Sequence, residues 1–180
     1  MKPQDIINFW FSPPQNQLWF ASTPAFDQQI RDQFERVWQQ ASNGLLDDWQ
    51  KDAIGCLALV ILLDQFPLNM FRGQPQSFST EQQAVAVSKK AIDKGFDQVL
   101  QDSHKVFLYM PFMHSESIED QNQSVALFEN AVLKDNVRFA VHHRDIVSRF
   151  GRFPHRNAIL GRQSSQAEID YLHSKEAFKG

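Results

Sequence analysis

The chain has 180 residues and a formal net charge of −3, with 42% hydrophobic and 22% charged residues. This length fits one domain with a sizeable core, and this composition excludes an intrinsically disordered chain. The single cysteine, Cys56, excludes an internal disulfide, and its apolar surroundings predict a small buried side chain in a reducing compartment.

The N-terminal residues have neither the apolar stretch nor the cleavage site of a signal peptide. The longest apolar run, Ala53 to Leu63, is too short to span a bilayer. We therefore expect a cytoplasmic protein with no membrane partner.

The spacing of apolar residues is helical in the first half of the chain. Three start or stop signals stand out: a proline pair, a threonine–proline pair that opens a helix, and an aspartate that can cap one. The expected helices are Asp5–Trp10 before Pro13-Pro14, a helix from Thr23-Pro24 that ends before Gly44, and an almost wholly apolar helix from Asp52 to Asp64, limited by Pro67.

The second half reads in the same way, and no segment alternates like a strand. The expected helices begin at the capping boxes of Ser79 and Thr80 and end at Lys94-Gly95, then cover His104–Met110 before Pro111, Ile118–Leu133, Val137–Phe150 before Gly151, and a segment after the capping box Ser165–Glu168. The sequence thus predicts an all-α single domain over residues 1–180, with seven to eight helices in a tetratricopeptide-like α-α superhelix.

Charge is concentrated near the C-terminus. Residues 138–162 carry six arginines and one aspartate, so the rest of the chain sums to −8. Four of those arginines lie in the segment 149–162, among phenylalanines, glycines and a proline. Guanidinium groups are always charged and their planar forks match carboxylates and phosphates. This segment, the arginine strip, therefore predicts an anion-holding surface, and the anion is either the protein's own carboxylates or a ligand.

Two further segments carry polar residues where the helical pattern breaks. Asp64 and Gln65 follow the apolar helix, and Asp64 needs a cation, for which Arg72 or the arginine strip could serve. His114 and Glu116 follow Pro111, where Glu116 is either a helix-start charge or a partner of a histidine in acid–base chemistry.

Two other kinds of site are not expected. The histidines and Glu116 lack the spacing of a zinc motif and lie in sequence beside arginines, so no metal or other cofactor is predicted. The chain is acidic overall and its basic strip is short, so no nucleic-acid partner is predicted.

Three motifs carry a resemblance to a known family: Leu-Leu-Asp-Gln-Phe-Pro-x-Asn-Met-Phe-Arg-Gly at 62–73, Met-Pro-Phe-Met-His-Ser-Glu at 110–116, and Arg-Phe-Gly-Arg-Phe-Pro-His-Arg-Asn-x-x-Leu-Gly-Arg at 149–162. Over essentially its whole length the chain resembles a bacterial family known as domain of unknown function number 924. The resemblance implies an all-helical, tetratricopeptide-like fold and implies no activity. One position departs from the family pattern: Leu68 stands where the family usually has arginine.

Three functions follow as hypotheses. The first is binding of a small anionic ligand, phosphate or carboxylate, in a fixed pocket built from all three motifs. The second is a tetratricopeptide-type module that holds an acidic peptide or protein. The third is a purely structural network of buried ion pairs. Whether the chain is an enzyme, and its oligomeric state, stay open. The pocket residues would be Asp64, Gln65, Arg72, His114, Glu116, Arg152, His155, Arg156, Asn157 and Arg162, with His114, Glu116 and His155 as the catalytic candidates.

Overall fold

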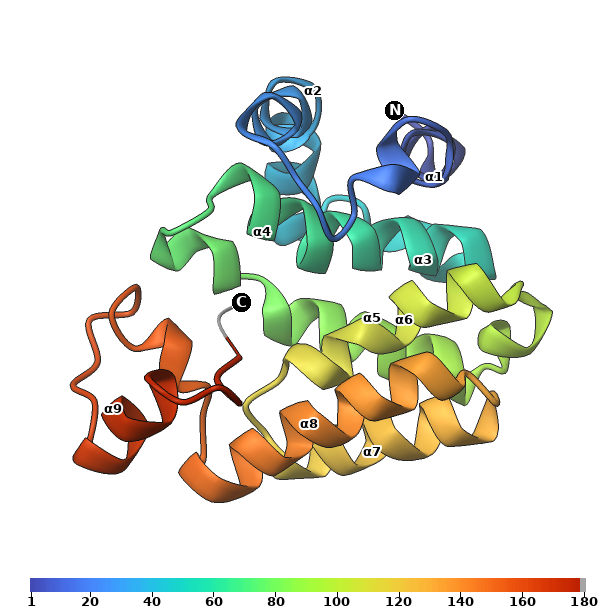
Figure 1. Ribbon diagram of the computed structural model, residues 1–180. Helices are drawn as coiled ribbons and strands as arrows, with labels where there is room; N and C mark the ends of the chain where they lie inside the picture. Colours follow the sequence, from blue (N-terminus) through green and yellow to red (C-terminus); the bar gives the residue numbers. More distant parts are fainter. Residues whose placement is uncertain (179–180) are drawn as a thin grey trace. The chain divides into compact units, whose positions relative to one another are not determined.

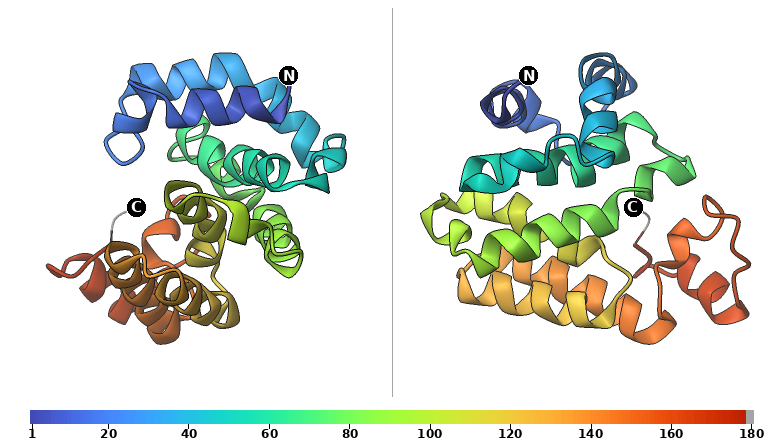
Figure 2. Two further views of the ribbon diagram at one scale, coloured as in Figure 1. Left: turned by 90° about the vertical axis from the view of Figure 1, so that its right-hand side faces the viewer. Right: turned by 180° about the vertical axis from the view of Figure 1, so that it is seen from behind.

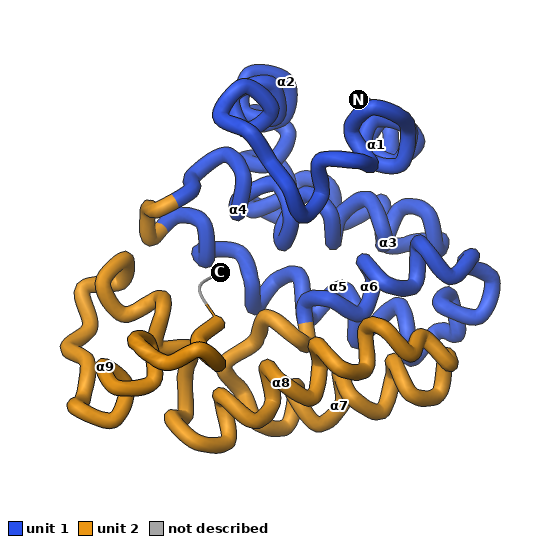
Figure 3. The backbone as a smooth tube through the Cα atoms, viewed as in Figure 1, with its two compact units in different colours: residues 1–72, 76–111 blue, residues 73–75, 112–180 orange. Residues whose placement is uncertain are grey.

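The computed structural model describes residues 1–178, and these form two compact units. Unit 1 comprises Met1–Arg72 and Gln76–Pro111, and unit 2 comprises Gly73–Pro75 and the chain from Phe112 onward (Figure 3). The expectation of one domain in a tetratricopeptide-like superhelix stays a prediction.

The all-α prediction is confirmed: residues 1–178 contain helices and no strand (Figure 1). There are eight α-helices among them when α3 and α4, which run on into each other, are counted together. The α-helices are α1 (Pro3–Phe11), α2 (Pro24–Ser42), α3 (Ala53–Val60), α4 (Phe66–Met70), α5 (Glu81–Asp93), α6 (Asp102–His114), α7 (Ile118–Asn130), α8 (Lys134–Phe150) and α9 (Gln166–Leu172). Short 3-10 turns are η1 (Gln15–Gln17), η2 (Asp47–Lys51), η4 (Pro75–Phe78), η5 (Phe96–Val99) and η6 (Pro154–Arg156).

Unit 1 is built around the apolar helix predicted at Ala53. The Asp52 carboxylate accepts a hydrogen bond from the Gly55 N–H at 2.8 Å, which confirms the predicted cap. A side chain at Gly55 would collide with the Trp49 carbonyl oxygen, so only glycine allows this close approach. α1 and α2 pack against one side of this helix and α5 against another (Figures 1 and 2).

Aromatic rings fill the space between these helices, as the composition predicts. The Phe34 ring lies 4.7 Å from both Phe9 and Phe66, measured between centroids. The Trp10 ring lies edge-on to Phe66 at 5.5 Å. Pairs with such geometry contribute about 0.5–1.5 kcal/mol each beyond the burial of their area.

The apolar helix does not stop at Pro67, as the sequence suggested, but runs to Met70 through a π-helical turn (Ile61–Gln65). Proline has no N–H, so in a regular helix the Leu63 carbonyl would lack its donor. The Thr80 hydroxyl supplies that donor at 2.6 Å and accepts a bond from the Trp38 indole N–H at 3.3 Å. Thr80 does precede α5, but its side chain makes no capping bond, so the predicted capping box is wrong.

By length and composition, the continuous helix Ala53–Met70 could cross a membrane. It is 83% buried inside the protein, which is the environment of a core helix. The apolar run from Ala53 to Leu63 is too short to span a bilayer, as stated above, but the helix that contains it extends to Met70.

The expected break at Pro111 is also wrong, because α6 continues through it to His114. An internal proline costs a helix about 3 kcal/mol. The flanking side chains of Phe107, Met110 and Phe112 are all buried. Each such burial contributes about 1.5–3 kcal/mol, so packing outweighs the missing bond.

In unit 2, α7 and α8 lie side by side as an antiparallel pair (Figures 1 and 2). Gly151, with φ of 70°, ends α8 in the left-handed conformation that glycine adopts without strain. The chain then passes through η6 to α9, which begins at the predicted capping box of Ser165 and Glu168. This C-terminal part of unit 2 contains the arginine strip.

We predict that Thr80→Val destabilises the protein by about 1–3 kcal/mol, because the Leu63 carbonyl and the Trp38 indole both lose a buried partner. Urea unfolding followed by circular dichroism measures this change. Thr80→Ser keeps the hydroxyl and is expected to lose less than half as much. Equal midpoints for the two variants would contradict the role of the hydroxyl.

Candidate functional site

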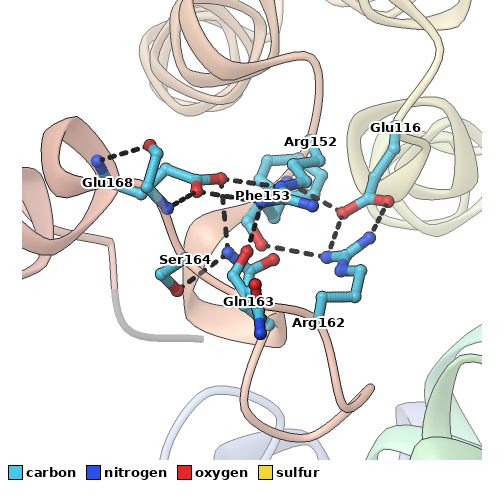
Figure 4. Close-up of polar contacts among 9 residues, drawn as sticks. Glu116, Arg152, Phe153, Arg162, Gln163, Ser164 and Glu168 are labelled. Carbon is cyan, nitrogen blue, oxygen red and sulfur yellow. Dashed lines mark hydrogen bonds and ion pairs between the residues drawn. The ribbon is translucent and has the colours of Figure 1, made fainter.

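The arginine strip is held against the start of α7 by an ion pair between Arg162 and Glu116 (Figure 4). Two guanidinium nitrogens of Arg162 donate to the two Glu116 oxygens at 2.7 and 2.9 Å. The Phe153 backbone N–H donates to the same carboxylate at 2.8 Å. Burial alone would raise the pKa of Glu116, but these three bonds outweigh it and lower the pKa. Glu116 is therefore a permanent anion at neutral pH.

A second pair joins Arg152 to Glu168 on α9 (Figure 4). Arg152 donates to the two carboxylate oxygens at 2.7 and 2.9 Å, and to the Gln163 carbonyl at 2.8 Å. Glu168 also accepts the Ser165 backbone N–H at 2.7 Å, which completes the capping box. The bond from Arg152 is the main reason that the pKa of Glu168 falls to about 2.

Arg156 and Asn157 are almost fully buried in the same region. The Arg156 guanidinium lies over the Phe153 ring, 4.6 Å from its centroid, and donates to the His114 carbonyl at 3.0 Å. Asn157 donates to the Ser164 hydroxyl at 3.0 Å and to Glu168 at 3.2 Å. Residues of the second motif thus contact the third motif within unit 2. That all three motifs form one pocket stays a prediction.

Two histidines near these groups, His155 and His143, are held neutral. Burial, and then repulsion by Arg156, lower the pKa of His155 to about 4. Burial also lowers the pKa of His143 to about 3. Among the described residues no hydrogen bond links His155 to Glu116. The Glu116 oxygens accept hydrogen bonds from Arg162 and from the Phe153 N–H instead. The catalytic roles suggested for His114, Glu116 and His155 stay predictions.

The first motif lies in unit 1, where Arg72 has a different partner from the expected one. Arg72 donates to both oxygens of Asp27, at 2.7 and 3.2 Å. The suggestion that Arg72 pairs with Asp64 is therefore wrong, because the Arg72 guanidinium donates to Asp27 on α2 instead. Asp64 is buried and accepts a bond from the Gln65 side chain at 2.6 Å.

Asp27 is the centre of a small network in unit 1. The Asn69 amide donates to Asp27 at 2.7 Å and to the Ser22 hydroxyl at 3.0 Å. Ser22 also donates to Asp27 at 2.6 Å. Burial would raise the pKa of Asp27, but Arg72, Ser22 and Asn69 together lower it. The network ties α2 to α4 and accounts for two polar residues of the first motif.

Arg149, the first arginine of the strip, has no carboxylate partner among residues 1–178. Arg149 is exposed at the end of α8, and no Asp or Glu among residues 1–178 forms an ion pair with it. Its guanidinium lies 4.7 Å from the centroid of the Phe150 ring. It borders a surface hollow of about 480 Å³, the Arg149 depression, whose lining residues are Arg149, Phe150, Arg152, Ser165, Ala167 and Glu168.

Sequence reasoning missed three of these residues as site residues: Asp27, Arg149 and Glu168. Glu168 was recognised only as a capping residue, because its bond to Ser165 is local while Arg152 is sixteen residues away. Arg149 lies within the arginine strip, but only the structure distinguishes it from Arg152 and Arg162, which are paired with carboxylates. Within residues 1–178, no group of three or more potential ligand side chains could hold a metal ion.

The Glu168 pKa gives a pH prediction. A carboxylate with a depressed pKa stabilises the fold fully above its ordinary pKa of 4.5, and this contribution is lost as pH falls toward about 2. Glu168→Gln is expected to lose about 1.5–3 kcal/mol at neutral pH, the value of hydrogen bonds to a charged group. The difference from the unsubstituted protein should shrink below pH 4.5, as urea unfolding at several pH values measures.

Glu129→Gln is the matched control, because Glu129 is exposed on α7. It should unfold at the same urea concentration as the unsubstituted protein at neutral pH. A Glu168→Gln deficit that stays constant down to pH 2 would contradict the assignment of an ionised Glu168.

Comparisons with known proteins agree with this fold. The solved structure of the protein of unknown function ATU0120 from Agrobacterium tumefaciens is similar, with 39% sequence identity and a TM-score of 0.89. The similarity covers 95% of this chain and 96% of that one. No curated protein matches the chain. The family model described as "Bacterial protein of unknown function (DUF924)" matches residues 6–176, and the chain belongs to that family.

Proposed function

We propose that unit 2 binds a small anion, through a phosphate or carboxylate group, in the Arg149 depression. The observation that carries this proposal is an arginine with no ion-pair partner among residues 1–178 at the edge of a hollow. Arg152 and Arg162 are already neutralised by Glu168 and Glu116. These two arginines would hold the fold, while Arg149 would receive the ligand.

The charge of the hollow favours an anion. Arg149 and Arg152 contribute two positive charges to its lining, and Glu168 contributes one negative charge. Hydrogen bonds to Glu168 raise the pKa of Arg152, so Arg152 stays charged throughout the accessible pH range. The hollow therefore has a net positive lining, and its volume falls in the range of small-molecule sites.

The position of Arg149 also favours binding. Its guanidinium is held over the Phe150 ring, and such a contact reduces the freedom that a long side chain loses on gripping a ligand. A guanidinium fork can donate two parallel hydrogen bonds to one phosphate or carboxylate. The same chemistry would suit a carboxylate of an acidic peptide, with Phe150 and Ala167 as apolar lining beside it.

The test is a calorimetric titration with inorganic phosphate at constant ionic strength, repeated with an acetylated acidic tetrapeptide. Arg149→Gln is expected to weaken binding of the preferred anion by about ten- to a hundredfold, as the loss of a charge-assisted hydrogen bond predicts. Its unfolding midpoint should not change, because no described residue depends on Arg149 for an ion pair.

Arg138→Gln is the matched control. Arg138 is exposed on the same helix and lies over its own neighbour, the Phe139 ring, at 5.1 Å, but it does not line the depression. It should bind the anion like the unsubstituted protein. Equal losses in the two variants, or no saturable binding by the unsubstituted protein, would overturn the proposal.

A further inference from the structure

The end of the described chain folds back over a group of imidazole rings in unit 2. The Phe178 ring lies edge-on to His143 at 4.4 Å and to His155 at 5.0 Å, with His142 at 6.3 Å. The Phe153 ring also lies near these imidazoles, 5.6 Å from each of His143 and His155. One aromatic ring from the tail thus covers histidines that come from both α8 and η6.

A hydrogen-bonded turn holds the tail in this position. After α9 the chain reverses, and the Phe178 backbone N–H donates to the Tyr171 hydroxyl at 2.9 Å. That hydroxyl donates in turn to the Glu176 carbonyl at 3.4 Å. Tyr171 is buried with Ile146 and Val147, and Phe178 packs against this cluster while remaining partly exposed. The ring therefore docks at the edge of a core and is not part of its interior.

Basic groups outnumber acidic groups among those that shift the pKa values of these two imidazoles. His155 interacts with Arg156, Arg162, His114 and Glu116, and His143 with His114, His142 and His155. Glu116, the only anion among these groups, is already paired with Arg162. His143 shares its Nδ1 with the Phe139 carbonyl at 2.8 Å, and since a carbonyl only accepts, Nδ1 carries the proton. A second proton on either ring would thus meet repulsion, at the buried position of His143 or the half-buried position of His155.

We propose that the segment from His173 to Phe178 is an acid-released latch, in which the Phe178 ring docks on neutral His143 and His155 and leaves when these imidazoles take up protons. Docking removes water from the rings, and removal of water disfavours the charged form. By linkage, protonation disfavours docking to the same extent. Release would uncover the two imidazoles and the apolar edge formed by Phe153 and Tyr171.

The direction of the pH effect follows from the lowered pKa values. The pKa of His143 is about 3 and that of His155 about 4 with the latch docked, against 6.5 for a free imidazole. Docking is therefore fully favoured above pH 6.5 and weakens as pH falls below it. The docking equilibrium falls by up to about tenfold per pH unit for each imidazole that Phe178 shields.

The test places 4-fluorophenylalanine at position 178 and follows its fluorine resonance by NMR from about pH 7.5 to about pH 4.5, the range in which uncovered imidazoles titrate. We expect one docked resonance at the upper end. At the lower end, a resonance at the free-chain position should grow so that the docked-to-free ratio falls about tenfold or more, while circular dichroism shows intact helices.

Two sets of variants separate the imidazoles from other causes. The double variant His143→Phe, His155→Phe keeps an aromatic ring at each position but removes the imidazole nitrogens that take up protons. The latch should therefore stay docked in acid. His173→Gln, on the exposed tail itself, should release as the unsubstituted protein does. Release that persists in the double variant, a resonance that stays docked in acid, or release only together with loss of helix would each overturn the latch.

A second measurement keeps the proposal testable if the double variant does not fold. In Phe178→Ala, NMR titration of the imidazole carbons should show the pKa values of His143 and His155 moving up toward 6.5. His104, which lies in unit 1, should keep its value. Unchanged pKa values for His143 and His155 would show that Phe178 does not shield them and would overturn the latch.

Discussion

The C-terminal part of unit 2 depends on two fork-shaped ion pairs, Arg162 with Glu116 and Arg152 with Glu168. The segment between Gly151 and α9 contains one short 3-10 turn and further turns, whose backbone hydrogen bonds join residues no more than five apart. Removing one partner of such a pair leaves the other charge without compensation, which is costly when the group is buried, as Glu168 is. Arg152 and Arg162, which the sequence suggested as ligand-binding residues, thus stabilise the fold by pairing with carboxylates of the protein.

Because Arg152 and Arg162 are paired with carboxylates, fewer arginines of the strip can bind an external anion. An arginine whose fork is already filled by a carboxylate offers little to a ligand unless that carboxylate leaves. Arg149 differs because an aromatic ring, and no carboxylate, orients its guanidinium. The structural hypothesis therefore describes Arg152 and Arg162, which the sequence suggested as ligand-binding residues, and the anion-binding proposal rests on Arg149 instead.

Sequence patterns predicted the helices well where the signals are local. Thr23 caps α2 and Ser165 with Glu168 caps α9, because a cap and its N–H lie within three residues of each other. The helix ends predicted at the two prolines were wrong. The sequence does not show that the Thr80 hydroxyl replaces the missing donor at Pro67, or that packing stabilises α6 across Pro111. The first compensation comes from Thr80, seventeen residues from Leu63, and the second comes from burial of the residues that flank Pro111.

The site was predictable only in outline, for the same reason. The convergence of the second and third motifs followed from the need to pair arginines with anions. Which carboxylate meets which arginine depends on tertiary structure: Arg72 binds Asp27, forty-five residues away, rather than Asp64. The covering of His143 and His155 by Phe178 has no signal in the sequence, because a single phenylalanine near a chain end fits no motif.

NMR of the arginine side-chain N–H groups during a phosphate titration tests directly whether groups of the protein itself occupy the strip's arginines except Arg149. The Arg152 Nε–H, bonded to Glu168, should exchange slowly with water and keep its chemical shift. The Arg149 Nε–H should exchange fast and shift as phosphate binds. Fast exchange and a phosphate-dependent shift at Arg152, with no change at Arg149, would contradict this assignment.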